Sequence, residues 1–76
     1  MYLGDLKIGI KAKIVSILSG NSVYRQRLIA MGLIPGTEVI VSRIAPFGDP
    51  IEVLVRGVAV SLRKDEAKIL KIEALT

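Results

Sequence analysis

The sequence of 76 residues contains no cysteine and no histidine. Without cysteine there can be no disulfide bond, so the stability of the fold has to come from apolar burial. Zinc, copper and ferrous iron sites draw mainly on cysteine and histidine, and nucleophilic catalysis usually needs a thiol or an imidazole base. The sequence also has no Gly-rich phosphate-binding motif and no calcium-loop spacing. The composition therefore predicts a protein that is not an enzyme and has no cofactor and no dedicated metal site.

Long hydrophobic runs are also lacking. An uncharged stretch such as residues 28–37 falls well short of the roughly 18 residues that a membrane-spanning helix needs. Gly32, Pro35 and Gly36 interrupt this stretch as well. The N-terminus has no basic region followed by an apolar segment, as a secretory signal would have. The sequence thus predicts a cytoplasmic protein that does not itself insert into a membrane.

Aromatic residues are few, with two tyrosines and one phenylalanine, and the net charge of +4 is mild. The only adjacent basic pair is Arg63-Lys64, and Asp65-Glu66 follow it at once. We interpret this charged run as a solvated corner. Nucleic-acid binding usually requires clustered basic residues with aromatic side chains between them. The pattern therefore argues against a nucleic-acid partner and favours a solvated basic surface, near an anionic membrane or an acidic partner.

Aliphatic side chains are abundant, and the hydrophobic fraction reaches 51%. Apolar and polar residues alternate with a period of two, which is typical of half-buried strands. Gly57 separates two such stretches and predicts a tight hairpin. The first predicted strand, at residues 11–18, has successive apolar residues, which indicates a bulge or cover on both faces. The strand at residues 39–44 is expected to be buried on both faces. Five strands are predicted, at residues 11–18, 39–44, 51–56, 58–63 and 69–75.

One segment breaks the strand pattern and predicts a helix at about residues 22–31. Asn21 or Ser22 can cap it, because a side-chain oxygen there accepts from an unpaired N–H of the first turn. Residues 25–27 are expected to face away from the core. Apolar residues recur at helical spacing and form one stripe, made of Tyr24, Leu28 and Met31.

Glycine and proline punctuate the end of this helix. Gly32 suits the left-handed residue that stops a helix, and Leu33 can make the accompanying hydrophobic contact. Pro35-Gly36 then suits a type II turn into the next strand. Five short strands with one inserted helix favour an all-β fold, a small SH3-like barrel in which the helix plugs one opening. Barrel closure would also protect strand edges from unwanted pairing.

Four strings of the sequence resemble the FeoA family, the small cytosolic component of ferrous iron transport. Their order and spacing resemble that family over essentially the whole chain, as one FeoA-type SH3-like domain at residues 1–76. Each string alone would be weak evidence, because Pro-Gly and Gly-Asp-Pro turns are common. The strings are residues 27–36 (RLIAMGLIPG), 45–51 (APFGDPI), 56–57 (RG) and 62–67 (LRKDEA).

The resemblance implies a regulatory subunit that contacts FeoB, a membrane Fe(II) transporter with a cytosolic G-protein region. Recruitment to the inner face of the membrane would come through this partner. A similar barrel forms the C-terminal domain of DtxR-type metal-dependent repressors, so an adaptor of that kind is an alternative, as is a nucleic-acid-binding SH3-like module. Without cysteine and histidine the chain is poorly equipped to carry iron, so we expect it to act by contact.

The contact is expected at a shallow groove between the end of the helix and the loop at residues 45–50. Phe47 at the loop tip either tucks under its own hairpin or protrudes as an anchor, and the sequence leaves both readings open. Strand edges of an imperfectly closed barrel could pair, so weak self-association is also left open. Aromatic and arginine residues are enriched at binding hot spots. The candidate contact residues are Tyr24, Arg25, Arg27, Met31, Leu33, Arg43, Pro46, Phe47 and Asp49.

Overall fold

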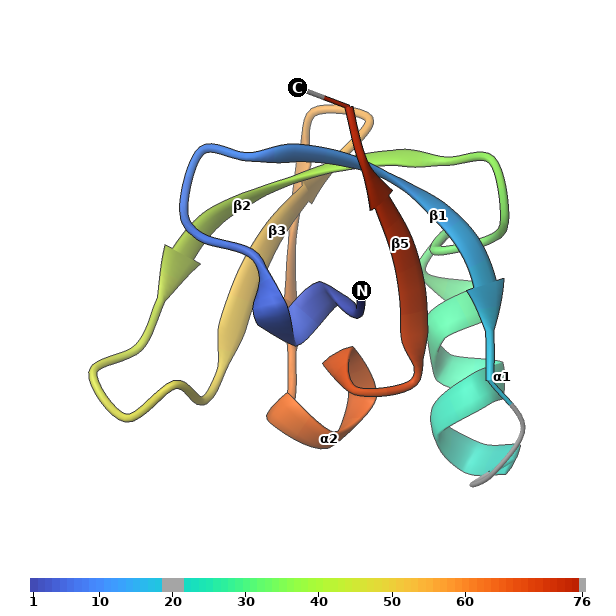
Figure 1. Cartoon of the computed structure of the whole chain (residues 1–76). Helices are drawn as coiled ribbons and strands as arrows, with labels where there is room; N and C mark the ends of the chain where they lie inside the picture. The colour runs from blue at the N-terminus through green and yellow to red at the C-terminus, as the bar shows by residue number, and fades with distance from the viewer. Residues whose placement is uncertain (19–21, 76) are drawn as a thin grey trace.

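The computed structural model describes residues 1–18 and 22–75. Five antiparallel strands form one sheet in the order β4-β3-β2-β1-β5, and the sheet curls around the core (Figure 1). The helix α1 stands beside one open end of this curl (Figure 1). This is the predicted small barrel with an inserted helix. The elements are η1 (Leu3–Asp5), β1 (Lys11–Ile17), α1 (Ser22–Ala30), β2 (Glu38–Ile44), β3 (Ile51–Val55), β4 (Val58–Leu62), α2 (Lys64–Ala67) and β5 (Leu70–Ala74).

Two irregularities bend the sheet. The pairing of β1 with β5 shifts register between Ile14 and Ser16, so of the two alternatives for this strand, a bulge or cover on both faces, the bulge is present. The pairing of β2 with β3 shifts between Val41 and Arg43. A bulge adds one unpaired residue and increases the local twist. These shifts therefore help a sheet of five short strands to curl.

The core is aliphatic and is supplied by alternate residues of the strands, together with residues of η1, α1, α2 and the segments that follow η1 and α1. Each buried CH₂ group contributes roughly 0.8 kcal/mol, which is how a chain without disulfides is stabilised. The expectation that residues 39–44 are buried on both faces is wrong in part, because Ile40 and Ile44 are only half-buried. The fully buried large aliphatic residues are Leu3, Ile14, Leu28, Leu33, Val39, Val41, Val53, Leu62 and Leu70.

The end of α1 follows the predicted chemistry. Gly32 has a φ of +84°, and the N–H of Leu33 donates to the carbonyl of Leu28 at 3.0 Å. This is a glycine-terminated helix stop in which Leu33 is drawn into the core. Ser22 is the first residue of the helix, while Asn21, the alternative cap, lies outside the described residues. The turn that follows also has the expected form, with a φ of +92° at Gly36.

The prediction that the charged run at residues 63–66 is a solvated corner is wrong in part, because Arg63, Lys64 and Asp65 are exposed but Glu66 is not. The run starts the short helix α2, and the side chain of Glu66 is fully buried. Oε1 of Glu66 accepts from the backbone N–H of Arg63 at 2.9 Å. It also accepts from Nη1 of Arg27, 39 residues away in the sequence. The carboxylate is buried because these donors replace water around it.

Candidate partner-binding face

Three adjoining hollows cover one side of the molecule, which we call the contact face. The middle hollow, of about 440 Å³, is lined by Arg27, Asp49, Pro50, Ser61 and Arg63. It shares Arg27 and Arg63 with a hollow beside α1, which Val23, Tyr24 and Glu66 complete. It shares Pro50 and Ser61 with a hollow beside the loop, which Arg43, Ala45, Pro46 and Glu52 complete. The contact face thus runs from α1, past the end of β4, to the loop between β2 and β3.

Arg27 lies at the centre of the contact face. Its Nη1 donates to the buried Glu66, and its Nη2 donates to the carbonyl of Ser61 at 3.5 Å. The side chain of Arg27 is still 46% exposed, whereas that of Glu66 is fully buried. Arg27 lies outside the hydrophobic core, as expected for residues 25–27, but its pairing with Glu66 was not predicted. The ion pair ties α1 to α2 and leaves part of the guanidinium group accessible.

The loop at residues 45–50 is anchored at its base. Oδ1 of Asp49 accepts from the backbone N–H of Lys64 at 3.0 Å, which links the loop to the first turn of α2. Within the loop, the N–H of Gly48 donates to the carbonyl of Ala45 at 2.8 Å, and the N–H of Ala45 donates to the carbonyl of Pro50 at 3.1 Å. These bonds hold the backbone on both sides of the tip.

Phe47, at the tip of this loop, is 93% exposed. Of the two readings left open by the sequence, the structure supports the protruding side chain. A fully exposed phenylalanine has an unfavourable contact with water, because its ring could bury 150–250 Å² in a partner. Burial of Phe47 in an interface would therefore contribute more favourable free energy than burial of any other residue of this loop.

Five of the predicted contact residues line the contact face, and Phe47 lies at the tip of the loop whose Ala45 and Pro46 line it, whereas Arg25, Met31 and Leu33 do not line it. The prediction that Leu33 contacts the partner is wrong, because its side chain is fully buried in the core. Met31 is half-buried and packs against the core, and Arg25 donates to the carbonyl of Ile17 at 3.4 Å. Those that line the contact face are Tyr24, Arg27, Arg43, Pro46 and Asp49.

The predicted groove is displaced along the helix. We expected it beside the end of α1, but the hollow that joins α1 to the loop is lined by Arg27, from the interior of the helix. Sequence reasoning missed Ser61, Arg63 and Glu66 as parts of this face. A signal for Glu66 was present, because a glutamate three residues after a helix-flanking residue is typical of the first turn of a helix.

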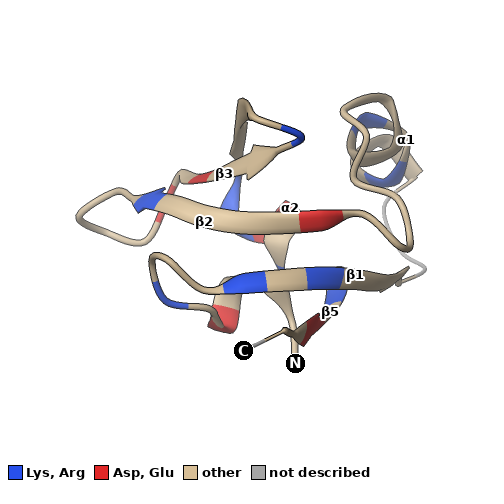
Figure 2. Cartoon of the chain, turned by 90° about the horizontal axis from the view of Figure 1, so that it is seen from above, with Lys and Arg blue, Asp and Glu red and all other residues tan. Residues whose placement is uncertain are grey.

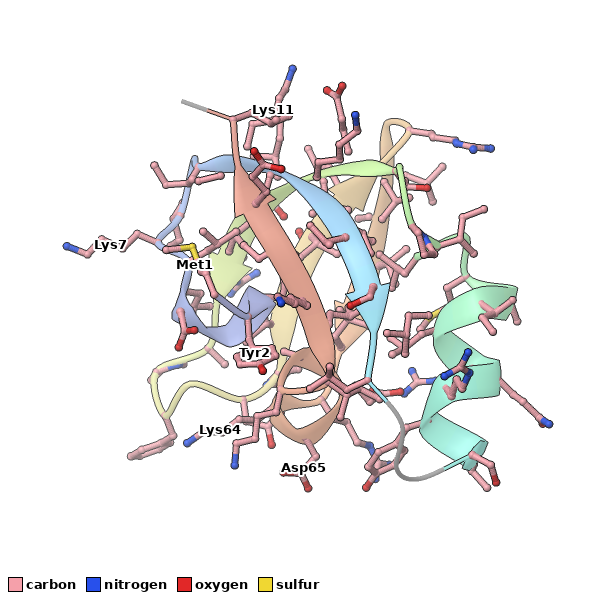
Figure 3. The ribbon with its side chains drawn as sticks, turned by 45° about the vertical axis from the view of Figure 1, so that its right-hand side comes forward. Met1, Tyr2, Lys7, Lys11, Lys64 and Asp65 are labelled. Atoms are coloured by element: carbon pink, nitrogen blue, oxygen red, sulfur yellow. The ribbon has the colours of Figure 1, made fainter. Side chains whose placement is uncertain are left out.

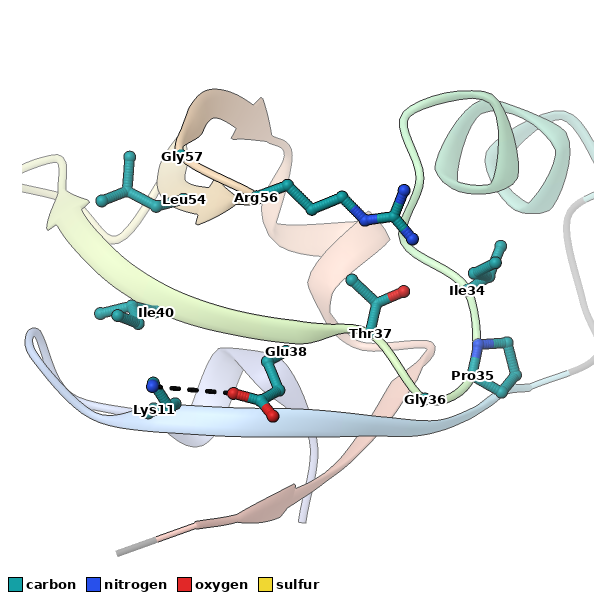
Figure 4. A pocket seen from close by; sticks show the side chains of 10 residues that line it. All are labelled: Lys11, Ile34, Pro35, Gly36, Thr37, Glu38, Ile40, Leu54, Arg56 and Gly57. Atoms are coloured by element: carbon teal, nitrogen blue, oxygen red, sulfur yellow. Dashed lines mark ion pairs between the residues drawn. The ribbon is translucent and has the colours of Figure 1, made fainter.

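A larger hollow, of about 690 Å³, lies near the turns at residues 34–37 and 56–57 (Figure 4). Its charged groups include Arg56 and the pair formed by Lys11 and Glu38, whose Nζ and Oε1 atoms are 3.6 Å apart. Both side chains of this pair are about half exposed, so the pair contributes little to stability. None of the predicted contact residues lines this hollow, and we do not assign it a role.

The described residues offer no metal centre, since no three His, Cys, Asp or Glu side chains among them lie close enough to hold an ion. Within the same residues, no helix is long and apolar enough to cross a membrane. Basic residues lie on several elements, among them β1, β2 and α1 (Figure 2).

The curled sheet of five antiparallel strands and the helix beside it define a small SH3-like β-barrel domain. The sequence matches the family described as FeoA domain over residues 1–74. The chain therefore belongs to the FeoA domain family.

Relatives and solved structures agree with this assignment. The Fe(2+) transport protein A/Fe(2+) transporter FeoB fusion protein of Porphyromonas gingivalis is 33% identical over 76 residues, which cover 100% of this chain and 9% of the fusion protein. The chain thus spans about a tenth of the length of this relative. The FeoA-like protein of Clostridium acetobutylicum is 38% identical, with a TM-score of 0.91 over 100% of this chain and 87% of that chain.

Two further structures bear on the fold. FeoA of Stenotrophomonas maltophilia, solved in complex with zinc and described as an SH3 domain protein, is 29% identical, with a TM-score of 0.83 over 96% of this chain and 89% of that chain. IdeR of T. acidophilum is 23% identical, with a TM-score of 0.88 over 97% of this chain and 33% of that chain. The likeness to IdeR shows the fold alone.

Proposed function

We propose that this chain is a small regulatory subunit of a ferrous iron uptake system and acts by protein–protein contact with a FeoB-type membrane transporter. The observation that carries the proposal is the Porphyromonas gingivalis relative, in which a sequence like this one is joined to a FeoB transporter in one chain. Joining two modules raises their effective concentration to the millimolar range. Such a fusion is favoured when the two parts work in contact.

The contact face supports a docking role. Phe47 offers an exposed aromatic side chain on a loop whose base is held by hydrogen bonds, so little conformational freedom is lost when the ring is buried. Arg27, Arg43 and Arg63 line the hollows behind this loop. Aromatic and arginine side chains dominate binding hot spots. We infer that the ring of Phe47 enters a pocket of the transporter's cytosolic G-protein region, while the arginines meet acidic groups around it.

A role through contact, not through chemistry, fits the residues available. The chain has no histidine or cysteine to act as a base, a nucleophile or a soft metal ligand. A chain without a spanning helix in its described residues would reach the membrane through its partner. The repressor-like alternative rests on shared fold alone, and the few aromatic residues and scattered basic residues of the sequence argue against a nucleic-acid role.

Phe47→Asp tests the proposal. The transporter's cytosolic region is titrated calorimetrically with the wild-type chain and with the variant. Burial of a phenylalanine ring contributes about 2 kcal/mol, so we expect the Kd to rise by about 30-fold. Because the ring is 93% exposed in the free chain, the melting temperature should stay within about 2 °C of the wild type.

Ile8→Asp is the matched control, because Ile8 is also exposed, at 58%, and lies outside the contact face. This variant should bind as the wild type does. Equal affinity for the wild type and Phe47→Asp would refute the anchoring role of Phe47. No binding by the wild type, at concentrations of about 100 μM, would refute the proposed partner.

A further inference from the structure

The two edge strands of the sheet differ in whether another segment of the chain pairs with them. Strands β4 and β5 are the outermost strands. The N-terminal segment lies along the outer edge of β5, where Tyr2 pairs with Lys71 and the N–H of Ile72 donates to the carbonyl of Met1 at 2.9 Å (Figure 3). Among the described residues, no segment pairs in this way with β4. One edge is therefore covered, and the other is open.

The backbone of β4 presents hydrogen-bonding groups to the open edge. The hairpin turn has two residues, Arg56 and Gly57, with φ values of 53° and 79°. The turn is closed by the pair Val55 and Val58, which exchange hydrogen bonds in such a hairpin. Because bonded and non-bonded pairs alternate along antiparallel strands, the N–H and C=O groups of Ala59 point away from β3.

The next outward-facing residue is Ser61, whose carbonyl accepts from Nη2 of Arg27 at 3.5 Å. For Ala59, no backbone hydrogen bond to another described segment engages its outward N–H or C=O. The open edge therefore has one vacant donor and acceptor pair at Ala59, and a weakly engaged carbonyl at Ser61.

Natural sheets usually protect an open edge with a charge, a proline or a bulge. Strand β4, with the sequence Val-Ala-Val-Ser-Leu, contains no charge and no proline, and its register with β3 is unbroken. Val58 is 63% exposed, and Val60, on the same face, is half-buried. An edge left open with exposed apolar residues is a template for an added strand.

Charges at the two ends of β4 indicate which strand would be added. Arg56 precedes the strand and Arg63 follows it, so both ends are basic. In full-length antiparallel pairing of two copies of β4, Val58 would face Leu62 and Gly57 would face Arg63, so Arg56 of one copy would lie next to Arg63 of the other. Like charges close to each other across paired strands are destabilising. The edge is thus unfavourable for a second copy and favourable for a segment with acidic residues at its ends.

We propose that the open edge of β4 receives an extended segment of the transporter's cytosolic region as a sixth strand. This segment carries apolar side chains next to Val58 and Val60, and acidic side chains near Arg56 and Arg63. The inference rests on the proposed function and names the way in which the partner is held. Phe47 anchors the loop side of the interface, while strand addition supplies main-chain hydrogen bonds at Ala59.

Amide hydrogen exchange tests this directly. The ¹⁵N-labelled chain is compared by NMR, free and saturated with the transporter's cytosolic region. We expect the exchange of the Ala59 amide to slow by at least about tenfold in the complex, because its hydrogen becomes bonded to the added strand. Unchanged exchange at Ala59 in a complex that forms would overturn the strand addition and leave the proposed function standing. Failure of the wild type to bind would overturn both.

Three variants complete the test. Ala59→Pro removes the outward N–H without removing a bond to β3, so it should weaken binding by about tenfold. Ala59→Thr is its control, because it keeps this N–H, and it should weaken binding by less than about threefold. Arg56→Glu should weaken binding by about threefold or more, because it places an acid beside the acidic end of the segment. If Arg56→Glu bound with unchanged affinity, the proposal that the added segment carries acidic side chains would be overturned. Protection of Ala59 that rises with the concentration of the chain alone would indicate a second copy and overturn the proposal.

Discussion

Arg27→Ala would leave the buried carboxylate of Glu66 with the backbone N–H of Arg63 as its remaining donor among the described residues. The other oxygen of this carboxylate, Oε2, is buried and has no hydrogen-bond partner within the same residues. Removing one partner of a buried ion pair costs about 3–5 kcal/mol, because the other charge remains buried without compensation. The side chain of Arg27 is 46% exposed, so solvent weakens the pair, and we expect a loss of about 2–3 kcal/mol.

A loss of this size corresponds to a drop in melting temperature of about 10–20 °C for a domain of this length. Thermal unfolding followed by circular dichroism measures it. Arg25→Ala is the matched control on the same helix, because Arg25 makes one long hydrogen bond at the surface, and it should cost about 0.5 kcal/mol or less. In a Glu66→Gln background, Arg27→Ala should cost at least about 1 kcal/mol less than it does alone. Equal melting temperatures for Arg27→Ala and Arg25→Ala would refute the stabilising role of the pair.

Two other predictions follow from the helix end and from the composition. Gly32→Ala should lower the free energy of unfolding in urea by about 1–2 kcal/mol, because Gly32 has a φ of +84° and an alanine there is strained even with its nearest contact at 4.0 Å. Gly4→Ala, at a glycine without a positive φ, should cost less than about 0.5 kcal/mol, and equal costs would contradict the explanation. Anaerobic titration of the isolated chain with Fe(II) should give no stoichiometric binding with a Kd below about 1 μM, whereas such binding would contradict a role through contact alone.

Local sequence patterns predicted most of the fold, because they act over a few residues. The period of two identified the five strands, and the glycines at positions 32 and 57 identified the helix end and the hairpin turn. The environment of Glu66 could not be predicted in this way. Its burial depends on Arg27, which is far away in the sequence and adjacent only in the folded chain. Considered alone, a run of two basic and two acidic residues predicts a segment that is exposed to solvent.

The candidate site was predicted less well than the fold, because it too depends on contacts between residues that are far apart in the sequence. A loop with a phenylalanine at its tip has the same local sequence whether the ring is buried or exposed, and the choice depends on what lies beneath the loop. Here the link between Asp49 and Lys64 holds the base of the loop, and Phe47 is left exposed. Leu33 was assigned to the surface although its role at the helix end already required a hydrophobic contact.

Photo-crosslinking in cells tests the central claim most directly. Phe47 is replaced by p-benzoylphenylalanine in the chain expressed together with the FeoB-type transporter, and Ile8 is replaced in the same way as a control. The account predicts that irradiation links position 47, and not position 8, to the cytosolic region of the transporter. Position 47 that forms no adduct with the transporter, or that forms no more than position 8, would contradict it.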